Sequence, residues 1–145
     1  MFLKTLHLRS FRNYAEQQVK FQAQKTILVG NNAQGKSNLL EAVELLATLK
    51  SHRATRDRDL ILEGAAAGQI LATLERLHGE SELLITLRSS GRRTLSLNQE
   101  ALRRQIDFWA FGMRSNFQSG LELVRGAPEC RRNWLDALLV QIEPV

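Results

Sequence analysis

Near the beginning of the chain, one stretch of eight residues reads Gly30-Asn31-Asn32-Ala33-Gln34-Gly35-Lys36-Ser37. It matches the pattern G-x-x-x-x-G-K-S/T, which is the phosphate-binding loop or Walker A motif. Glycines let the backbone turn tightly and bring its N–H groups up to phosphate oxygens. We expect the Lys36 ammonium to reach the β- and γ-phosphates and the Ser37 hydroxyl to bind Mg²⁺. The motif therefore predicts that these residues hold a nucleoside triphosphate with its magnesium ion.

The residues on either side of the motif fit its usual setting between a strand and a helix. Residues 26–29 form a short apolar run, Thr-Ile-Leu-Val, which predicts a buried central strand. Residues 38–50 hold good helix formers and contain neither glycine nor proline, so they predict a helix. The N-terminus of that helix would direct its free N–H groups and its dipole at a bound phosphate.

Alternating apolar and polar residues predict further strands. Leu6 and Leu8 alternate with polar neighbours before a break at residues 10–14, which we interpret as a loop, and residues 19–21 repeat the alternation. After the helix, residues 51–59 are dense in charge and predict an exposed loop. Three strand-like segments and a tight turn follow, at residues 69–76, 82–88, 93–97 and 98–100. Their short connections favour an antiparallel meander.

The order of these elements narrows the fold class. Two strands precede the phosphate-binding loop and an antiparallel meander follows it, which suits the ATP-binding lobe of an ABC-type ATPase. We therefore expect an α/β fold: an ABC-type P-loop ATPase head with a mixed sheet, an antiparallel meander and the start of a helical lobe. Residues 1–102 are expected to form the nucleotide-binding lobe, and residues 103–145 the beginning of the helical lobe.

The sequence lacks the second acidic group that P-loop enzymes use to hold Mg²⁺. No run of four apolar residues is followed by aspartate, so no Walker B strand is visible. We expect nucleotide binding, assign no catalytic residue, and leave hydrolysis open. Two alternatives remain: the head of another SMC-like or transporter-type ATPase, and an inactive module that binds no nucleotide.

Composition excludes several other classes of protein. The 145 residues suffice for one modest domain with a core. Three scattered histidines and the single Cys130 offer no metal-ligand spacing and no internal disulfide, which fits a reducing cytoplasm. No apolar run approaches the ~18 residues of a membrane span, so we expect a cytoplasmic protein without a membrane partner.

The basic residues suggest an acidic partner. A formal net charge of +5 permits nucleic acid, and Arg53, Arg56 and Arg58 are candidates for contacts with DNA phosphates. Other basic pairs occur at residues 92–93, 103–104 and 131–132. Each cluster could equally form an ordinary solvated face. For Trp109 and Trp134, core packing is a more common role than stacking on bases.

Several segments resemble the RecF family of bacterial recombination mediators. They include Phe11-Arg12-Asn13-Tyr14, the Walker A motif with its continuation Asn38-Leu39-Leu40-Glu41-Ala42, Ser51-His52-Arg53, and residues 123–129 with Arg131-Arg132 and Leu135-Asp136. The resemblance extends over nearly the whole chain. The continuation of the Walker A motif is shared with SMC-like ATPases generally, whereas Ser-His-Arg and Arg-Arg-x-x-Leu-Asp are more specific to the RecF family. Residues 107–120 depart from the family's pattern.

The resemblance implies a function and a set of partners. RecF-type proteins bind ATP with Mg²⁺, hydrolyse it weakly, and form homodimers in its presence. They bind single-stranded and gapped double-stranded DNA, act with RecO and RecR to load RecA in recombinational repair and replication restart, and support the SOS response. At matching positions, Arg12 and Asn13 are expected to approach the bound nucleotide. Because family members are more than twice this length, we expect the chain to be a truncated member without the signature motif.

Overall fold

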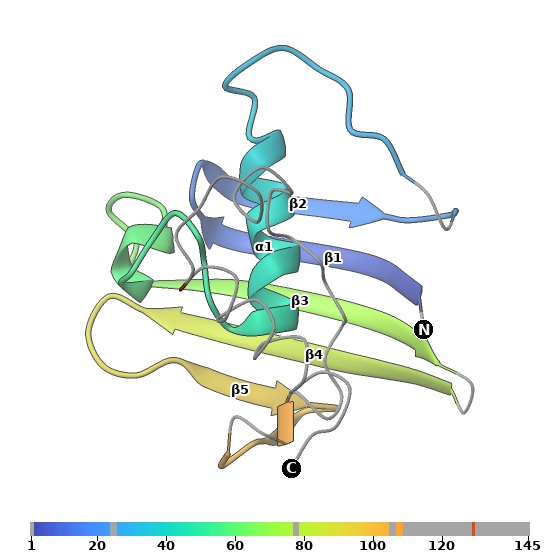
Figure 1. Cartoon of the computed structure of the whole chain (residues 1–145). Helices are drawn as coiled ribbons and strands as arrows, with labels where there is room; N and C mark the ends of the chain where they lie inside the picture. Colours follow the sequence, from blue (N-terminus) through green and yellow to red (C-terminus); the bar gives the residue numbers. More distant parts are fainter. Residues whose placement is uncertain (1, 24–25, 77–78, 105–106, 109–128, 130–145) are drawn as a thin grey trace.

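The computed structural model describes residues 2–23, 26–76, 79–104, 107–108 and 129 of the chain. Its main feature is a six-stranded sheet with the strand order β2-β1-β3-β4-β5-β6, in which each neighbouring pair is antiparallel. The strands are β1 (Phe2–Phe11), β2 (Tyr14–Lys20), β3 (Ala67–Arg76), β4 (Gly79–Arg88), β5 (Thr94–Leu97) and β6 (Glu100–Ala101). The helix α1 (Lys36–Thr48) lies across one face of this sheet, and a short 3₁₀ helix, η1 (Asp57–Leu60), lies in the connection to β3 (Figure 1).

Alternating burial along the strands places the apolar side chains of one sheet face against α1. The buried residues of β3 and β4 recur at every second position: Ile70, Ala72, Leu74, Leu83, Ile85 and Leu87. The same core cluster takes leucines from β1 and α1, namely Leu6, Leu8, Leu39, Leu45 and Leu46. Full burial of each such side chain contributes about 1.5–3 kcal/mol. This packing fixes the position of α1 on the sheet, and with it the loop that precedes α1.

The antiparallel meander predicted after the helix is confirmed. β3 pairs with β4 and β4 pairs with β5 in continuous antiparallel registers. The connection from β5 to β6 is a two-residue turn at Asn98 and Gln99, where a tight turn was predicted. Both residues have positive φ, 49° and 70°, as a type I′ hairpin turn requires.

The first two strands are joined by a tighter turn than the sequence suggested. A loop was expected over residues 10–14, but only Arg12 and Asn13 lie between the end of β1 and the start of β2. Arg12 has a φ of +53°, and its backbone N–H donates to the carbonyl oxygen of Leu60 at 2.8 Å. The turn is therefore held against the segment that follows α1.

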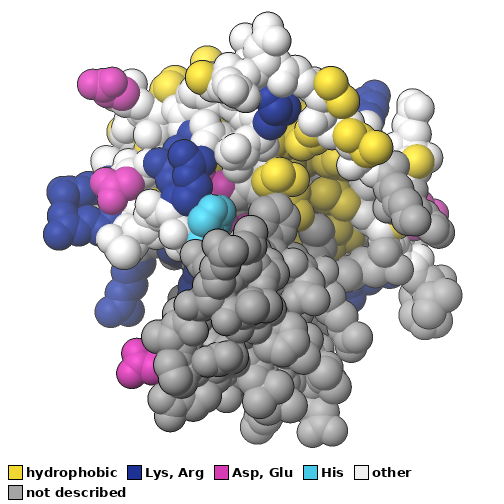
Figure 2. Space-filling view, turned by 45° about the horizontal axis from the view of Figure 1, so that its top comes forward, with side chains coloured by type: hydrophobic (Ala, Val, Ile, Leu, Met, Phe, Trp, Pro, Cys, Tyr) yellow, Lys and Arg dark blue, Asp and Glu magenta, His cyan; other side chains and the backbone are white. Residues whose placement is uncertain are grey.

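The prediction of a buried strand immediately before the phosphate-binding loop is wrong in this structure. Residues 26–30 form no strand, and the side chains of Ile27 and Val29 are 85% and 89% exposed. A buried strand needs neighbours for its N–H and C=O groups, whereas the strands of the described sheet pair with one another and leave this segment outside. The sheet is accordingly antiparallel throughout the described residues. Figure 2 turns this end of the molecule toward the reader and shows apolar side chains on its surface.

The helix predicted over residues 38–50 is confirmed, with both bounds two residues earlier, at Lys36–Thr48. Predictions for residues 109–128, Cys130, the pair at 131–132 and Trp134 lie outside the described residues, and the division into two lobes at residue 103 stays a prediction. Among the described residues, no helix is long and apolar enough to cross a membrane. Within the same ranges, no group of three or more His, Cys, Asp or Glu side chains could hold a metal ion.

Candidate nucleotide-binding site

The phosphate-binding loop ends in the first turn of α1. Gly35 is the N-cap residue, with φ 94° and ψ 0°, and the helix begins at Lys36. The N–H groups of Asn38 and Leu39 donate to the Gly35 carbonyl oxygen at 2.8 and 3.0 Å, which closes the first turn. No side chain caps this end by a hydrogen bond, and no acidic residue occupies the first turn. The free N–H groups and the positive end of the helix dipole are therefore uncompensated, as a phosphate site requires.

The Lys36 side chain folds back over the loop. Its ammonium donates to the carbonyl oxygen of Gly30 at 2.7 Å and also to that of Asn31. A side-chain carbon built on Gly30 would lie 3.9 Å from both Cδ and Nζ of Lys36, so the lysine stem runs directly over this glycine. An ammonium has three donors, and two carbonyl oxygens leave one donor for a phosphate oxygen.

The other residues of the motif are accessible. Asn31, Asn32, Ala33 and Gln34 are exposed, and Ala33 turns the loop with a φ of +61°. Ser37 is exposed in the first turn of α1, so its hydroxyl is accessible to a magnesium ion. Accessible N–H groups, one ammonium and one hydroxyl form the donor set that the phosphates of a nucleotide and their Mg²⁺ need. The residues present therefore fit both groups.

Two side chains from the β1–β2 turn region lie against Gly35. A Cβ on Gly35 would meet Tyr14 Oη at 2.7 Å and Asn13 Nδ2 at 2.9 Å, and the φ of +94° would strain any other residue, so this position favours glycine. Asn38 Nδ2 in turn donates to Asn13 Oδ1 at 2.8 Å. Burial raises the pKa of the Tyr14 phenol, which keeps it protonated near neutral pH. The structure thus brings Asn13 to the loop and adds Tyr14, whose contact with Gly35 no sequence spacing indicated.

Arg12 forms a bidentate ion pair with α1. Its Nε and Nη2 donate to the two carboxylate oxygens of Glu41 at 2.9 and 2.7 Å, and its Nη1 donates to the Asp59 carbonyl oxygen at 2.7 Å. Glu41 is fully buried, and the Ser51 hydroxyl donates to the same carboxylate. All three guanidinium nitrogens of Arg12 therefore donate hydrogen bonds to protein groups. This network joins the β1–β2 turn to α1 and η1, while direct contact of Arg12 with a nucleotide stays a prediction.

The ionised form of Glu41 stabilises the fold over a defined pH range. Burial by itself raises the pKa of Glu41, but hydrogen bonds from Arg12 and Ser51, with the charges of Arg12 and Arg53, outweigh it and leave this pKa below its usual range. The unfolded chain therefore takes up a proton at Glu41 before the folded chain does. We expect the stabilising contribution to be complete above the unfolded pKa, about 4.3, and to be lost as the pH falls through the lower folded value.

Urea unfolding of the unmodified chain and of Glu41→Gln, from about pH 7 to about pH 3, measures this contribution. The difference between their unfolding free energies should shrink as the pH falls below about 4.3. Glu63→Gln is the matched control, because Glu63 is an exposed carboxylate in the connection to β3. A difference between the unmodified chain and Glu41→Gln that does not change with pH would contradict the assignment.

The structure separates the three arginines that the sequence grouped as DNA contacts. Arg53 Nη1 donates to Asn38 Oδ1 at 2.8 Å and lies 3.7 Å from the Glu41 carboxylate. Arg53 thus belongs to the network beside the phosphate-binding loop. Arg56 and Arg58 are exposed further along the chain, where other arginines gather. Residues that are close in sequence are therefore divided between two sites.

A phosphate-binding loop at the N-terminus of a helix, packed on an antiparallel sheet, defines the class of ABC-type P-loop ATPase heads. Residues 2–106 match the family described as RecF/RecN/SMC N terminal domain, and the chain belongs to this family. Within the family, it is similar to proteins named DNA replication and repair protein RecF. It is 70% identical to the one from Gloeothece citriformis and 66% identical to the one from Nostoc punctiforme.

Both alignments cover the whole chain, which spans 38% and 39% of these two curated relatives. A solved structure described as the recombination mediator protein RecF-ATP in RecFOR pathway matches with a TM-score of 0.86 at 25% identity, over 99% of this chain and 39% of that one. A structure from work on ATP-driven dimerization and DNA stimulated activation of SMC ATPases has a TM-score of 0.76 at 20% identity, over 95% of this chain and 99% of that one, and shows the fold alone. The predicted head fold and the resemblance to the RecF family are confirmed.

Proposed function

We propose that this chain provides the ATP-binding site of a RecF-type protein of recombinational repair. The proposal is carried by the junction of loop and helix: an uncapped N-terminus of α1 without acidic residues, with the Lys36 ammonium folded over the preceding loop. ATP is the proposed nucleotide because the similar solved structure is described as a complex of RecF with ATP. The names of the curated relatives support the role in DNA replication and repair.

The residues of the site have separate tasks in this proposal. Backbone N–H groups of the loop and the first turn of α1 bind phosphate oxygens, and Lys36 neutralises charge on the β- and γ-phosphates. Ser37 would hold Mg²⁺, which when bound would neutralise negative charge on the phosphates. Asn13 and Tyr14 hold the loop at Gly35, so that its N–H groups keep their direction. We assign no catalytic base to this chain, and its proposed task is to bind the nucleotide.

Binding of ATP is proposed to bring two copies together and to regulate contact with DNA. The fold shared with SMC ATPases, described as undergoing ATP-driven dimerization, supports the first part. The proposed partners are single-stranded and gapped double-stranded DNA, with RecO and RecR, in RecA loading and the SOS response in the cytoplasm. In this proposal, residues 1–102 form the nucleotide-binding lobe and residues 103–145 begin the helical lobe.

Thermal melting with and without Mg-ATP tests the binding of nucleotide. A ligand that binds only the folded chain stabilises it by RT ln(1 + [L]/Kd), which is about 2.7 kcal/mol at 100 times Kd. We expect the Tm to rise steadily with the concentration of Mg-ATP. AMP is the control, because it lacks the β- and γ-phosphates and should raise the Tm far less. A chain that melts cooperatively at the same temperature with and without millimolar Mg-ATP would contradict the proposal.

A further inference from the structure

The two edges of the sheet differ in length. β6 forms one edge and holds two residues, whereas β2 forms the other edge and holds seven (Figure 1). A very short edge strand offers little for another strand to pair with, but a long one presents a row of free N–H and C=O groups. Five of the seven residues of β2 are exposed, and the strand contains neither proline nor glycine. Of the two edges, β2 is therefore the one suited to accept a further strand.

The direction of the backbone groups along β2 follows from its pairing with β1. Phe21, directly after β2, donates its N–H to the carbonyl oxygen of Lys4 in β1 at 2.8 Å. In an antiparallel pair, successive residues point their N–H and C=O groups alternately toward the partner strand and away from it. Because residue 21 points toward β1, so do residues 19 and 17 of the continuous register. The groups that point outward belong to the residues between them: Glu16, Gln18 and Lys20.

A contact within the chain agrees with this outward direction. The side-chain Nε2 of Gln17 donates to the carbonyl oxygen of Gln18 at 3.1 Å. Inside a sheet, such an oxygen accepts from the backbone N–H of the neighbouring strand, and β2 has a described neighbour on one side only. The amide of Gln17 thus occupies a position that the N–H of a further strand would take. The carbonyl oxygen also keeps a second lone pair for that strand.

A second copy of β2 fits this edge in an antiparallel register centred on Gln18. In that register each Glu16 lies opposite the partner's Lys20, and Gln18 lies opposite its own copy. All of these residues point their backbone groups outward, so each pair can exchange two hydrogen bonds. Registers centred on Gln17 or Val19 also align the outward groups, but they set Glu16 opposite a glutamine. The register centred on Gln18 is therefore the one of these three that pairs opposite charges.

The side chains of this register are placed for contact. Those of Glu16, Gln18 and Lys20 share one face of the strand, because side chains alternate along a strand. Arg9 Nε donates to Oε1 of Glu16 at 3.1 Å, and His7 Nε2 lies 2.9 Å from the same oxygen. These hydrogen bonds, with that of Arg9 the stronger, lower the pKa of Glu16, so the carboxylate is charged at neutral pH. Oε2 is left open to the ammonium of the partner's Lys20.

We propose that β2 is an interface at which two copies of this chain pair edge to edge, with Gln18 at the two-fold axis. Because each edge pairs with its own copy, the assembly closes at two chains. An edge of seven residues is small for an interface, so the dimer forms at about micromolar or higher concentrations. This inference goes beyond the proposed function, because the pairing needs no nucleotide and uses none of residues 30–37.

Sedimentation equilibrium of the whole chain without nucleotide, over a range of protein concentrations, tests this proposal. We expect the mass to rise with concentration toward twice that of one chain. Lys20→Glu sets two carboxylates opposite each other, and Glu16→Lys sets two ammonium groups opposite each other. Each variant alone should therefore dimerise at least about tenfold more weakly. An equimolar mixture of the two variants restores opposite charges at both positions, so a mixed dimer should recover most of the affinity.

Lys50→Glu is the matched control, because Lys50 is an exposed lysine beyond the end of α1 and outside β2. It should dimerise within about twofold of the unmodified chain. A mass that stays at one chain throughout would overturn the proposal, and so would a mixture that dimerises no better than its components. A dimer that appears only with Mg-ATP would overturn it as well. Since these measurements contain no nucleotide, failure of the proposed ATP site would not alter them.

Amide hydrogen exchange measured by NMR tests the same interface without substitution. The N–H groups of Glu16, Gln18 and Lys20 point outward, so they should exchange rapidly in dilute solution. At concentrations that favour the dimer, their exchange should become at least about tenfold slower. The N–H groups of Gln17 and Val19 point toward β1 and should be protected at both concentrations. Equal exchange of the outward N–H groups at both concentrations would contradict the proposal.

Discussion

Replacing Arg12 by methionine is expected to lower the free energy of unfolding by about 3 kcal/mol, the low end of the range for breaking a buried ion pair. The Glu41 side chain is fully buried and that of Arg12 is 19% exposed. Without Arg12, the partners that the described residues still offer the carboxylate are the Ser51 hydroxyl and the more distant charge of Arg53, at 3.7 Å. Methionine retains most of the aliphatic stem, so loss of packing adds little. Urea unfolding measures the change, which is large against a typical total of about 5–15 kcal/mol.

Two controls separate the ion pair from other effects of the substitution. Arg9→Met removes an arginine of β1, the strand that ends just before Arg12. Its side chain is 58% exposed and is paired with exposed Glu16, so the substitution should cost less than about 1 kcal/mol. The double variant Arg12→Met/Glu41→Met removes both charges, so it should recover most of the lost stability. Equal losses in Arg12→Met and Arg9→Met would contradict the role of the pair. Strictly additive losses in the double variant would do so too.

The antiparallel meander was predictable because local signals agree along the chain. Apolar residues recur at every second position of β3 and β4, and turn-forming residues separate the strands. The helix after the motif was predictable for a similar reason, since residues 38–50 hold good helix formers without glycine or proline. Periodicity of two or of 3.6 residues is a property of the local sequence, and tertiary packing here agrees with it.

The segment before the motif shows a limit of predicting structure from the local sequence. The run at residues 26–29 has the composition of a buried strand, yet Ile27 and Val29 are 85% and 89% exposed. A central strand depends on hydrogen-bonding partners from distant parts of a chain, and no local pattern specifies them. The strands of the described sheet pair with one another, and residues 26–30 form no strand and pair with none of them. A prediction from composition alone could not include this requirement.

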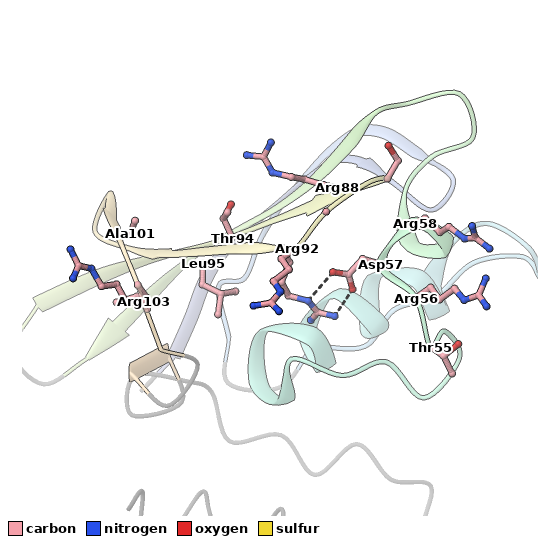
Figure 3. A pocket seen from close by; sticks show the side chains of 14 residues that line it. Thr55, Arg56, Asp57, Arg58, Arg88, Arg92, Thr94, Leu95, Ala101 and Arg103 are labelled. Carbon is pink, nitrogen blue, oxygen red and sulfur yellow. Dashed lines mark hydrogen bonds and ion pairs between the residues drawn. The ribbon is translucent and has the colours of Figure 1, made fainter.

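The residues of the candidate site also fall into two groups: those that the local sequence predicts and those that only the fold brings together. The motif at residues 30–37 was found from local spacing, because a phosphate cradle is built from consecutive backbone groups. The ion pair beside the loop was not found from local spacing, because Arg12 and Glu41 are 29 positions apart and are joined only by the fold. The approach of Tyr14 to Gly35 is a further case. Another is the polar cavity lined by Arg56, Arg92 and Arg103 (Figure 3), because these arginines come from separate segments of the chain. Sequence showed which residues carry charge, and the fold determines which charges share a surface.

Replacing Lys36 by alanine is expected to weaken the binding of Mg-ATP at least about 100-fold. A hydrogen bond to a charged group contributes about 1.5–3 kcal/mol, and Lys36 is expected to make such bonds to two phosphates. A loss of about 3 kcal/mol corresponds to slightly more than 100-fold in Kd. Isothermal titration calorimetry of the unmodified chain and the variant measures this difference directly.

The fold itself should tolerate the loss of the Lys36 ammonium. In this structure its protein partners are two carbonyl oxygens of the exposed loop, at Gly30 and Asn31, which water can replace. The Tm without nucleotide should therefore change little, which separates loss of binding from loss of folding. Lys36→Arg keeps the charge but presents a wide planar fork where the loop accommodates a compact ammonium, so affinity should fall there too. Lys50→Ala removes an exposed lysine beyond the other end of α1 and should bind normally. Wild-type affinity in Lys36→Ala would remove this loop from the nucleotide site.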